Sequence, residues 1–167
     1  MTIEFSAEST TDDVLSNIDL SGKRVLITGI SAGLGVETAR AIAVRGAKVV
    51  GTARDLAKAG KALKAYKPLA IEVLDCNLAS LASVRACAYT LITRGDRFDV
   101  VVANAGVMNC PLSHTEDGFE MQFGTNHLGH FVLVNRIAPL IVDGGRVVVL
   151  SSSAHRAADV NLDDPGF

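Results

Sequence analysis

Two kinds of hydrophobic pattern alternate along this chain of 167 residues. Short, continuous apolar runs are typical of strands that are buried on both faces of a parallel sheet. Between them lie longer stretches in which apolar residues recur every three or four positions, as they do on one face of a helix. The runs predict five strands, at residues 23–28, 47–52, 69–74, 98–102 and 146–150.

Turn and capping residues mark the ends of the helical stretches between these strands. Gly46 and Gly95 follow two of them, Asp55 stands at the start of another, and one begins at Asn77 or Ser80. The expected helices cover residues 36–45, 55–66, 77 or 80 to 94, and 119–140, the last with Phe123, His127, Phe131, Val134 and Ile137 at helical spacing.

The alternation of strands with helices predicts an α/β fold, a doubly wound parallel sheet with the strand order 3-2-1-4-5. Residues 21–167 would form this domain, and residues 1–20 an N-terminal extension with a short helix capped by Thr10 or Thr11. Helices after the first two strands would cover one face, and those flanking the fourth strand the other. Strands four and five would then lack cover on the first face, which predicts poor solubility or a partner.

A turn with three glycines follows the first predicted strand. Its sequence at residues 28–35 is Thr-Gly-Ile-Ser-Ala-Gly-Leu-Gly, and a helix begins where it ends. Glycines let the backbone turn tightly and approach a ligand, while the free N–H groups and positive end of the helix attract an anion. A mononucleotide P-loop would carry Lys and Ser or Thr where Val36 and Glu37 stand. The turn predicts a dinucleotide site; taken alone, it is equally compatible with an ordinary strand-to-helix loop.

The end of the second predicted strand reads Thr52-Ala53-Arg54-Asp55. Dinucleotide folds discriminate the adenosine ribose at this point: a carboxylate accepts hydrogen bonds from its hydroxyls, whereas an Arg pairs with a 2′-phosphate. Arg54 therefore favours NADP over NAD. In the alternative interpretation, Arg54 is a solvated surface charge and Asp55 only a helix cap.

Composition narrows the class of protein. Charged residues make up 20% of the chain and the net charge is −2, so nothing favours a nucleic-acid partner. Arg136 and Asp143 interrupt the longest apolar stretch, and we expect no membrane span. The N-terminal residues lack the pattern of a secretory signal, and the three cysteines have no CxxC spacing, as is usual in a reducing compartment. These features predict a soluble, cytoplasmic protein.

Two further pairs of residues have side chains that could take part in metal binding or catalysis. His127 and His130 have the i, i+3 spacing of metal ligands, but no third ligand stands nearby in the sequence, so packing or polar surface is preferred and no metal is expected. Cys110 and His155 could form a nucleophile pair, but nothing marks Cys110 as an activated thiolate.

Four motifs, in this order and on these elements, resemble the short-chain dehydrogenase/reductase family. They are the glycine turn, Asn-Ala-Gly at residues 104–106, Asn-His-Leu-Gly-His-Phe at 126–131, and Ser-Ser-Ser-Ala-His at 151–155. The chain is most similar to the group that contains retinol dehydrogenases and protochlorophyllide reductases, over residues 20–167.

The resemblance implies a Rossmann fold that binds NADP, with NAD as the second choice, and an oxidoreductase that transfers hydride between the nicotinamide and a carbonyl or alcohol carbon. Asn77 and Ala103 depart from the Asp and Asn of the family, although the Asn77 amide oxygen can still accept a hydrogen bond from the adenine amino group. The cofactor-binding residues that it implies are Gly29, Ser31, Gly33, Leu34, Gly35, Arg54, Asn77, Leu78, Asn104, Ala105 and Gly106.

Two catalytic residues are also implied by the resemblance. Asn126 matches the active-site Asn that holds a water in the proton relay, and Ser152 matches the Ser that hydrogen-bonds the substrate oxygen. Such a donor stabilises charge that develops on oxygen during hydride transfer. Taken alone, the three serines at 151–153 would be a polar loop after a strand.

The acid/base pair of the family, a Tyr with a Lys four residues later, has no match here. The two tyrosines, Tyr66 and Tyr89, are followed at the Lys position by Ala70 and Thr93. We therefore expect this chain to hold the cofactor-binding half of an enzyme truncated before that pair, which forms a homo-oligomer when complete. The alternative is a catalytically inactive dinucleotide-binding or interaction module.

Overall fold

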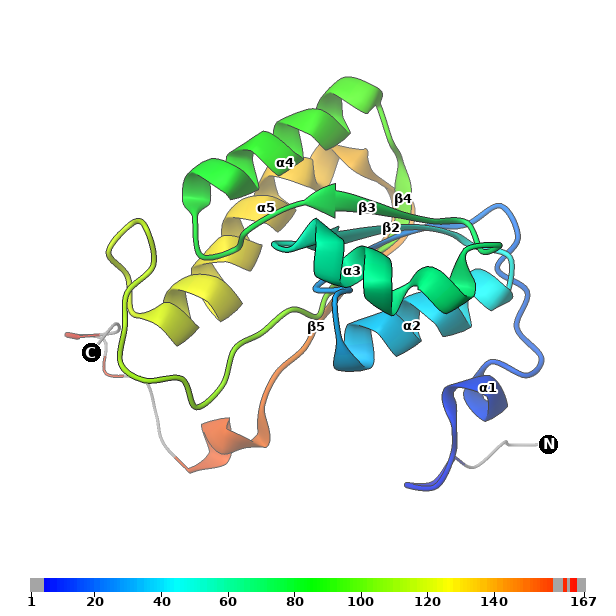
Figure 1. Ribbon diagram of the computed structural model, residues 1–167, viewed down its shortest axis with the longest axis horizontal. Coiled ribbons are helices and arrows are strands. Elements are labelled where there is room, and N and C mark those ends of the chain that lie inside the picture. The colour runs from blue at the N-terminus through cyan, green and yellow to red at the C-terminus, as the bar shows by residue number, and fades with distance from the viewer. Residues whose placement is uncertain (1–4, 158–160, 162, 165–167) are drawn as a thin grey trace.

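The strands of this protein form one parallel sheet between two layers of helices (Figure 1). The computed structural model describes residues 5–157, 161, 163 and 164. Within these residues the sheet has five strands in the order β3-β2-β1-β4-β5, all parallel, which confirms the predicted order. The strands are β1 (Arg24–Thr28), β2 (Lys48–Ala53), β3 (Ile71–Asp75), β4 (Phe98–Ala103) and β5 (Ile141–Val149).

The helices lie on both faces of the sheet. Figure 1 shows α2 and α3 in one layer and α4 and α5 in the other, with α1 beside α2. Their bounds are Thr11–Val14 for α1, Gly33–Val44 for α2, Leu56–Ala62 for α3, Leu81–Arg94 for α4 and His130–Ile137 for α5. A π-helical segment, Phe123–Gly129, leads into α5, and short 3₁₀ turns lie at Lys64–Tyr66, Ala138–Leu140 and Ser153–Arg156.

Several helix ends follow directly from capping chemistry. Thr10 and Asp13 form a reciprocal capping box at α1, so Thr10 rather than Thr11 is the cap. Ser80 caps α4, since its side chain accepts from the backbone N–H of Ser83. Gly95 ends α4 in the left-handed conformation, with a φ of +66°.

The two faces of the sheet bury separate clusters. Leu26 and Phe98 pack with Leu133 in the cluster beneath α4 and α5. Ile27 and Ala39 belong to the cluster on the α2 face. Because neighbouring residues of a strand point to opposite faces, the continuous apolar run of β1 supplies both clusters.

The uncovered part of the sheet is smaller than the sequence predicts. Val102 of β4 is only 9% exposed and belongs to the cluster on the α2 face, so β4 is covered. Along β5, Val147, Val148 and Val149 are 41%, 45% and 65% exposed. Successive side chains of a strand face opposite ways, so β5 is open on both faces.

The helix predicted at residues 119–140 begins later and faces differently. Glu120 precedes it and caps it, since the carboxylate accepts from the backbone N–H groups of Gln122 and Phe123 at 2.9 and 2.7 Å. The aromatic residues at helical spacing face outward: His127 stacks with Phe123 and Phe131, with ring centroids 5.3 and 6.3 Å apart. Smaller or polar residues are buried instead, among them Gly124, Thr125, Gly129 and His130.

The last strand also departs from its prediction. β5 starts at Ile141, earlier than expected, because Ile141 pairs with Phe98 before the register shifts and Arg146 pairs with Val100. Residues 143–145, Asp-Gly-Gly, lie in that irregularity. Across the described residues, no helix is long and apolar enough to cross a membrane.

Candidate functional site

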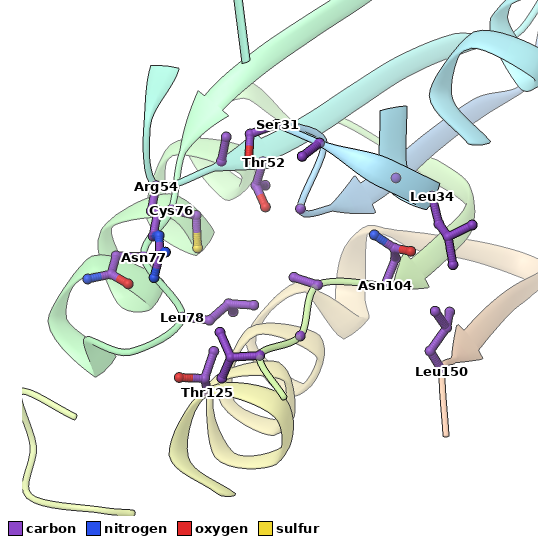
Figure 2. A pocket seen from close by; sticks show the side chains of 17 residues that line it. Ser31, Leu34, Thr52, Arg54, Cys76, Asn77, Leu78, Asn104, Thr125 and Leu150 are labelled. Carbon is purple, nitrogen blue, oxygen red and sulfur yellow. The ribbon is translucent and has the colours of Figure 1, made fainter. Parts of the chain in front are cut away.

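The carboxyl ends of the central strands open into a cavity of about 340 Å³ (Figure 2). It lies where the chain winds outward from β1 in both directions, to β2 and β3 on one side and to β4 and β5 on the other. Ligands of doubly wound sheets bind in the crevice at this switch point. The fold therefore marks this cavity as the candidate site.

Ten of the eleven residues predicted to bind the cofactor line this cavity. Gly33 is the exception; it begins α2 with a φ of +60°. Neither Asn126 nor Ser152, the predicted catalytic residues, is among the lining residues. The ten that line it are Gly29, Ser31, Leu34, Gly35, Arg54, Asn77, Leu78, Asn104, Ala105 and Gly106.

Seven lining residues were missed by the sequence-based prediction. Five of them directly adjoin a predicted residue, and the other two, Thr52 and Leu150, lie at or just after strand ends. The rule that ligands meet the carboxyl ends of parallel strands could have found both. The seven are Ala32, Thr52, Ala53, Cys76, Val107, Thr125 and Leu150.

The glycine turn is shaped by close backbone contacts. Gly29 has a φ of +77°, and a Cβ there would lie 2.7 Å from Ala105 Cβ. A Cβ on Gly35 would lie 2.6 Å from Asn104 Nδ2, so both positions require glycine. The N-cap of α2 is Ala32, which offers no side-chain cap. The first N–H groups of α2 are thus left for an anion in the cavity.

Arg54 and Asp55, which follow β2, have different roles in the structure. Asp55 caps α3, since its carboxylate accepts from the backbone N–H of Lys58 at 2.8 Å. Arg54 lines the cavity and is exposed, and it makes no ion pair with any residue that the structure describes. The cavity thus has a cationic side chain at its β2 end, where Figure 2 labels Arg54.

Asn77 and Leu78 form the part of the cavity that follows β3. The side chain of Asn77 accepts a hydrogen bond from Ala79 N at 3.1 Å and donates one to Glu116 Oε1 at 3.3 Å. Leu78 is buried, and its carbonyl would lie 2.5 Å from a Cβ placed on Gly129. The amide of Asn77 is therefore held in place, while its oxygen keeps a second lone pair.

A polar network joins the ends of β1 and β4 to α5. Thr28 Oγ1 accepts from the backbone N–H groups of Asn104 and Ala105, each at 2.9 Å, and Asn104 Nδ2 donates to the Thr28 carbonyl at 2.8 Å. His130 places Nε2 2.8 Å from Thr28 Oγ1 and Nδ1 2.8 Å from the backbone oxygen of Asn126. Burial lowers the pKa of His130 and outweighs the hydrogen bond with Asn126, which raises it.

Asn126 fastens the loop after β4 to the π-helical segment. Its Oδ1 accepts from Val107 N and its Nδ2 donates to Val107 O, both at 2.8 Å. Because Val107 lines the cavity, Asn126 supports the wall of the cavity from outside.

Ser152 lies just past β5, two residues after the lining residue Leu150. Its side chain is exposed, and Oγ accepts from the backbone N–H of Ala154 at 3.1 Å. A hydroxyl can accept and donate at the same time, so its proton remains free for a ligand.

The structure describes the two histidines that have the spacing of metal ligands and one thiol in the cavity. Over the described part of the chain, no three His, Cys, Asp or Glu side chains gather as a metal site would require, and His127 and His130 lie on different faces of the helix. Cys76, the thiol that lines the cavity, has its pKa raised by a hydrogen bond with Cys87 and by burial, so it is not an activated nucleophile.

The strand order and the cavity at the switch point are those of the Rossmann-type α/β fold. The family model for short chain dehydrogenase matches residues 23–161, and the chain therefore belongs to the short-chain dehydrogenase family. The chain is 40% identical to human retinol dehydrogenase 14, in an alignment that covers 87% of this chain and 49% of that protein. It spans about half the length of the curated relatives that it matches.

Two solved structures are similar to this protein over most of the chain. A protein from Mycobacterium paratuberculosis has a TM-score of 0.81 at 41% identity, covering 89% of this chain and 53% of that one. The NADP complex of Pseudomonas aeruginosa RhlG has a TM-score of 0.65 at 27% identity, covering 77% of this chain and 54% of that one.

Proposed function

We propose that this chain binds NADP in the cavity at the carboxyl edge of the sheet, as the cofactor-binding half of a short-chain oxidoreductase. The observation that carries the proposal is that ten of the eleven residues predicted to bind the cofactor meet at one cavity at the switch point of the sheet. The cofactor supplies the hydride chemistry, between nicotinamide and a carbonyl or alcohol carbon of a small molecule.

The shape and charge of the cavity fit a dinucleotide phosphate. A Cβ on Gly29 would collide with Ala105 and one on Gly35 with Asn104, so only glycine lets the turn fold this tightly at the cavity. Such a turn would let a pyrophosphate approach the backbone closely. The uncapped N–H groups at the start of α2 would donate to its oxygens. Arg54 would pair with the 2′-phosphate, and this pairing is the basis for the preference for NADP.

Two residues at the far end of the site would act on the substrate. The Ser152 hydroxyl, fixed by the N–H of Ala154, would donate its proton to the substrate oxygen and stabilise the charge that develops there. Asn126 would hold the Val107 wall and, through the proton relay, a water. The Tyr and Lys of the family have no counterpart in this sequence, so turnover would require groups that these residues do not provide.

The second candidate function is a dinucleotide-binding or interaction module without catalysis. It is favoured by the absence of a Tyr-Lys pair from the sequence and by the open faces of β5. The two candidates differ in what the complete protein does with bound NADPH: the oxidoreductase oxidises it when offered carbonyl compounds, whereas the module binds it without turnover.

The test is a titration of the purified chain with NADPH and NADH, followed by nicotinamide fluorescence and by melting temperature. We expect tighter binding of NADPH, and about a tenfold loss of that preference in Arg54→Ala. Lys61→Ala, on the exposed side of α3, is the matched control for losing a cation and should bind like wild type. A folded chain that binds neither cofactor would refute the proposal.

A further inference from the structure

We propose that His130 is a positioning residue of this site, an inference that rests on the proposed function. Its neutral ring, with the proton on Nδ1, ties the Thr28 hydroxyl to the backbone carbonyl of Asn126. The ring thereby sets the cofactor turn and the catalytic Asn126 in one fixed arrangement.

The first step concerns the direction of the hydrogen bond between Thr28 and His130. Thr28 Oγ1 already accepts from two backbone N–H groups, those of Asn104 and Ala105. A hydroxyl has two acceptor lone pairs and one proton, so the only remaining capacity of Thr28 is to donate. His130 Nε2, 2.8 Å away, must therefore be the acceptor and carry no proton.

The second step fixes the other nitrogen. A neutral imidazole that is unprotonated at Nε2 carries its proton on Nδ1, which lies 2.8 Å from the Asn126 backbone oxygen. A carbonyl oxygen can only accept, so Nδ1 must donate to it. This agrees with the proton position that the Thr28 contact requires. The ring is buried and its pKa is lowered, as a neutral imidazole requires.

The third step explains why a side chain meets this carbonyl. In an α-helix the backbone N–H of His130 would donate to the oxygen of Asn126, four residues earlier. Here that N–H donates to His127 O, at the end of the π-helical segment Phe123–Gly129. The ring Nδ1–H of His130 donates to the Asn126 oxygen in place of the backbone N–H. Local π-helical turns of this kind occur frequently at functional sites.

The consequence is a direct chain of contacts between the two halves of the site. Thr28 begins the glycine turn and holds Asn104 and Ala105, which line the cavity, and Asn126 holds Val107 at the other end. Among the described residues, His130 is the single side chain that hydrogen-bonds both Thr28 and Asn126. It acts through these residues and does not line the cavity itself.

Two substitutions separate the two contacts. The Gln side chain places its oxygen near the position of Nε2, so His130→Gln keeps an acceptor for Thr28 and loses the donor to Asn126. The Asn side chain places its amide N–H near the position of Nδ1, so His130→Asn keeps the donor to Asn126. It has no atom near Nε2 and loses the acceptor for the Thr28 hydroxyl. His127→Gln is the matched control, since His127 lies on the exposed face of the same helix.

The first measurement needs no cofactor. Two-bond proton–nitrogen correlation spectra of the ¹⁵N-labelled chain at pH 7.5 identify which ring nitrogen of each histidine carries the proton. We expect protonated Nδ1 and bare Nε2 for His130, whose signals disappear in the His130→Gln spectrum. A proton on Nε2, alone or in a charged ring, would overturn the inference even if NADPH binds.

The second measurement compares NADPH affinity with the Asn126 carbonyl ¹³C resonance. We expect His130→Asn to lose about tenfold in affinity with the resonance unmoved, and His130→Gln to stay within about threefold with the resonance shifted. Equal effects of both variants on affinity and resonance would overturn the positioning role. If the wild-type chain binds no cofactor, the proposed function fails instead, and the tautomer of His130 is still read separately.

Discussion

The junction of Thr28, Asn104, Asn126 and His130, which is buried at Thr28 and His130, and the exposed contact between α1 and α2 both join distant segments through polar side chains. In the junction, Thr28 is fully buried and His130 is 6% exposed, and the bonded groups are neutral. The α1 contact is charged and partly solvated, with the Asp12 side chain 58% exposed.

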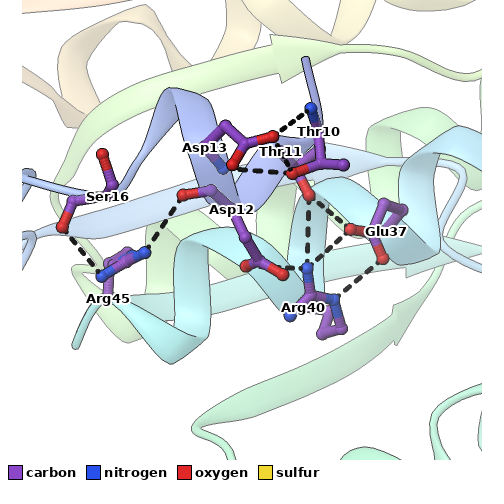
Figure 3. Close-up of polar contacts among 8 residues, drawn as sticks. All are labelled: Thr10, Thr11, Asp12, Asp13, Ser16, Glu37, Arg40 and Arg45. Atoms are coloured by element: carbon purple, nitrogen blue, oxygen red, sulfur yellow. Dashed lines mark hydrogen bonds and ion pairs between the residues drawn. The ribbon is translucent and has the colours of Figure 1, made fainter. Parts of the chain in front are cut away.

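Figure 3 shows the α1 contact in detail. Arg40 Nη2 lies 3.0 Å from Asp12 Oδ1 and 2.7 Å from Glu37 Oε1, and Thr11 Oγ1 donates to the same Glu37 oxygen at 2.5 Å. Hydrogen bonds from Arg40 and Thr11 lower the pKa of Glu37 to about 2. Arg45 adds bonds to the backbone oxygens of Asp12 and Ser16.

The comparison teaches that surroundings, more than the number of bonds, decide what a polar network contributes. Exposed ion pairs contribute about 0–1 kcal/mol, because water and salt screen them in the folded state and solvate their partners when the pair is broken. A buried group that loses its partner keeps its full desolvation cost, about 1–3 kcal/mol each. Equivalent removals in the two networks should therefore differ severalfold.

Thr28→Val should have the largest effect. It leaves the backbone N–H of Ala105 and the Nε2 of His130 without a partner, while the N–H of Asn104 keeps the Val102 carbonyl at 3.0 Å. Two buried groups without partners should lower the free energy of unfolding by about 3 kcal/mol. Thr52→Val is the matched control: Thr52 is 1% exposed at the paired position of β2, and its hydroxyl has no partner within the described residues. Urea unfolding of both variants measures the difference, and equal losses would break the comparison.

Gly35→Ala should have the second largest effect and lower the free energy of unfolding by about 2 kcal/mol. A methyl group there would lie 2.6 Å from Asn104 Nδ2 and against the carbonyl of Gly29, so the junction must deform. The same substitution at exposed Gly60 within α3 meets open space and should stabilise the chain by up to about 1 kcal/mol, as Ala favours helix. Thermal unfolding of the two variants should shift in opposite directions; a stabilised Gly35→Ala would contradict the close approach.

Acid should weaken the junction before it weakens the α1 contact. The folded pKa of His130 is lowered by burial, so the unfolded chain takes up its proton first. This contribution to stability is complete above about pH 6.5, the unfolded value, and falls as the pH drops toward the folded pKa. The lowered pKa of Glu37 acts only below about pH 4.5.

Urea unfolding at pH 7.5, 6.0 and 5.0 separates the two windows. The decline of wild type between pH 7.5 and 5.0 should be reduced in His130→Gln, which has no ring to protonate. Identical pH profiles for the two proteins would show that His130 does not titrate differently in the folded and unfolded chain. Groups outside the junction, including His127, cancel in this subtraction.

Local chemistry accounts for the parts of this fold that could be predicted. The caps Asp55 and Ser80 and the stop at Gly95 act over a few residues, and the apolar runs of the strands need no distant information. The strand order follows from the general rules for parallel sheets. Most of the cavity could be predicted as well, because its residues stand next to recognisable motifs at strand ends.

The misjudged features depend on contacts that are remote in sequence. The spacing of Phe123, His127 and Phe131 identifies a helix but not its buried side, which is set by the close approach of Gly129 to Leu78. The partner of His130 is Thr28, 102 positions away. Hydrophobic periodicity carries no information on such a pair, so the neutral network at the centre of the site was not predicted.

The smallest effect is expected for Arg40→Gln in the α1 contact. It removes the ion pairs with Asp12 and Glu37, yet it should lower the free energy of unfolding by only about 1 kcal/mol or less. That difference from wild type should shrink further in 1 M NaCl, where the Debye length falls from about 10 Å to about 3 Å. Arg85→Gln on α4 removes an exposed cation that makes no ion pair with the described residues and serves as the control. A loss as large as that of Thr28→Val, unchanged by salt, would mean that α1 is held as firmly as the buried junction, and the distinction between the two networks would fail.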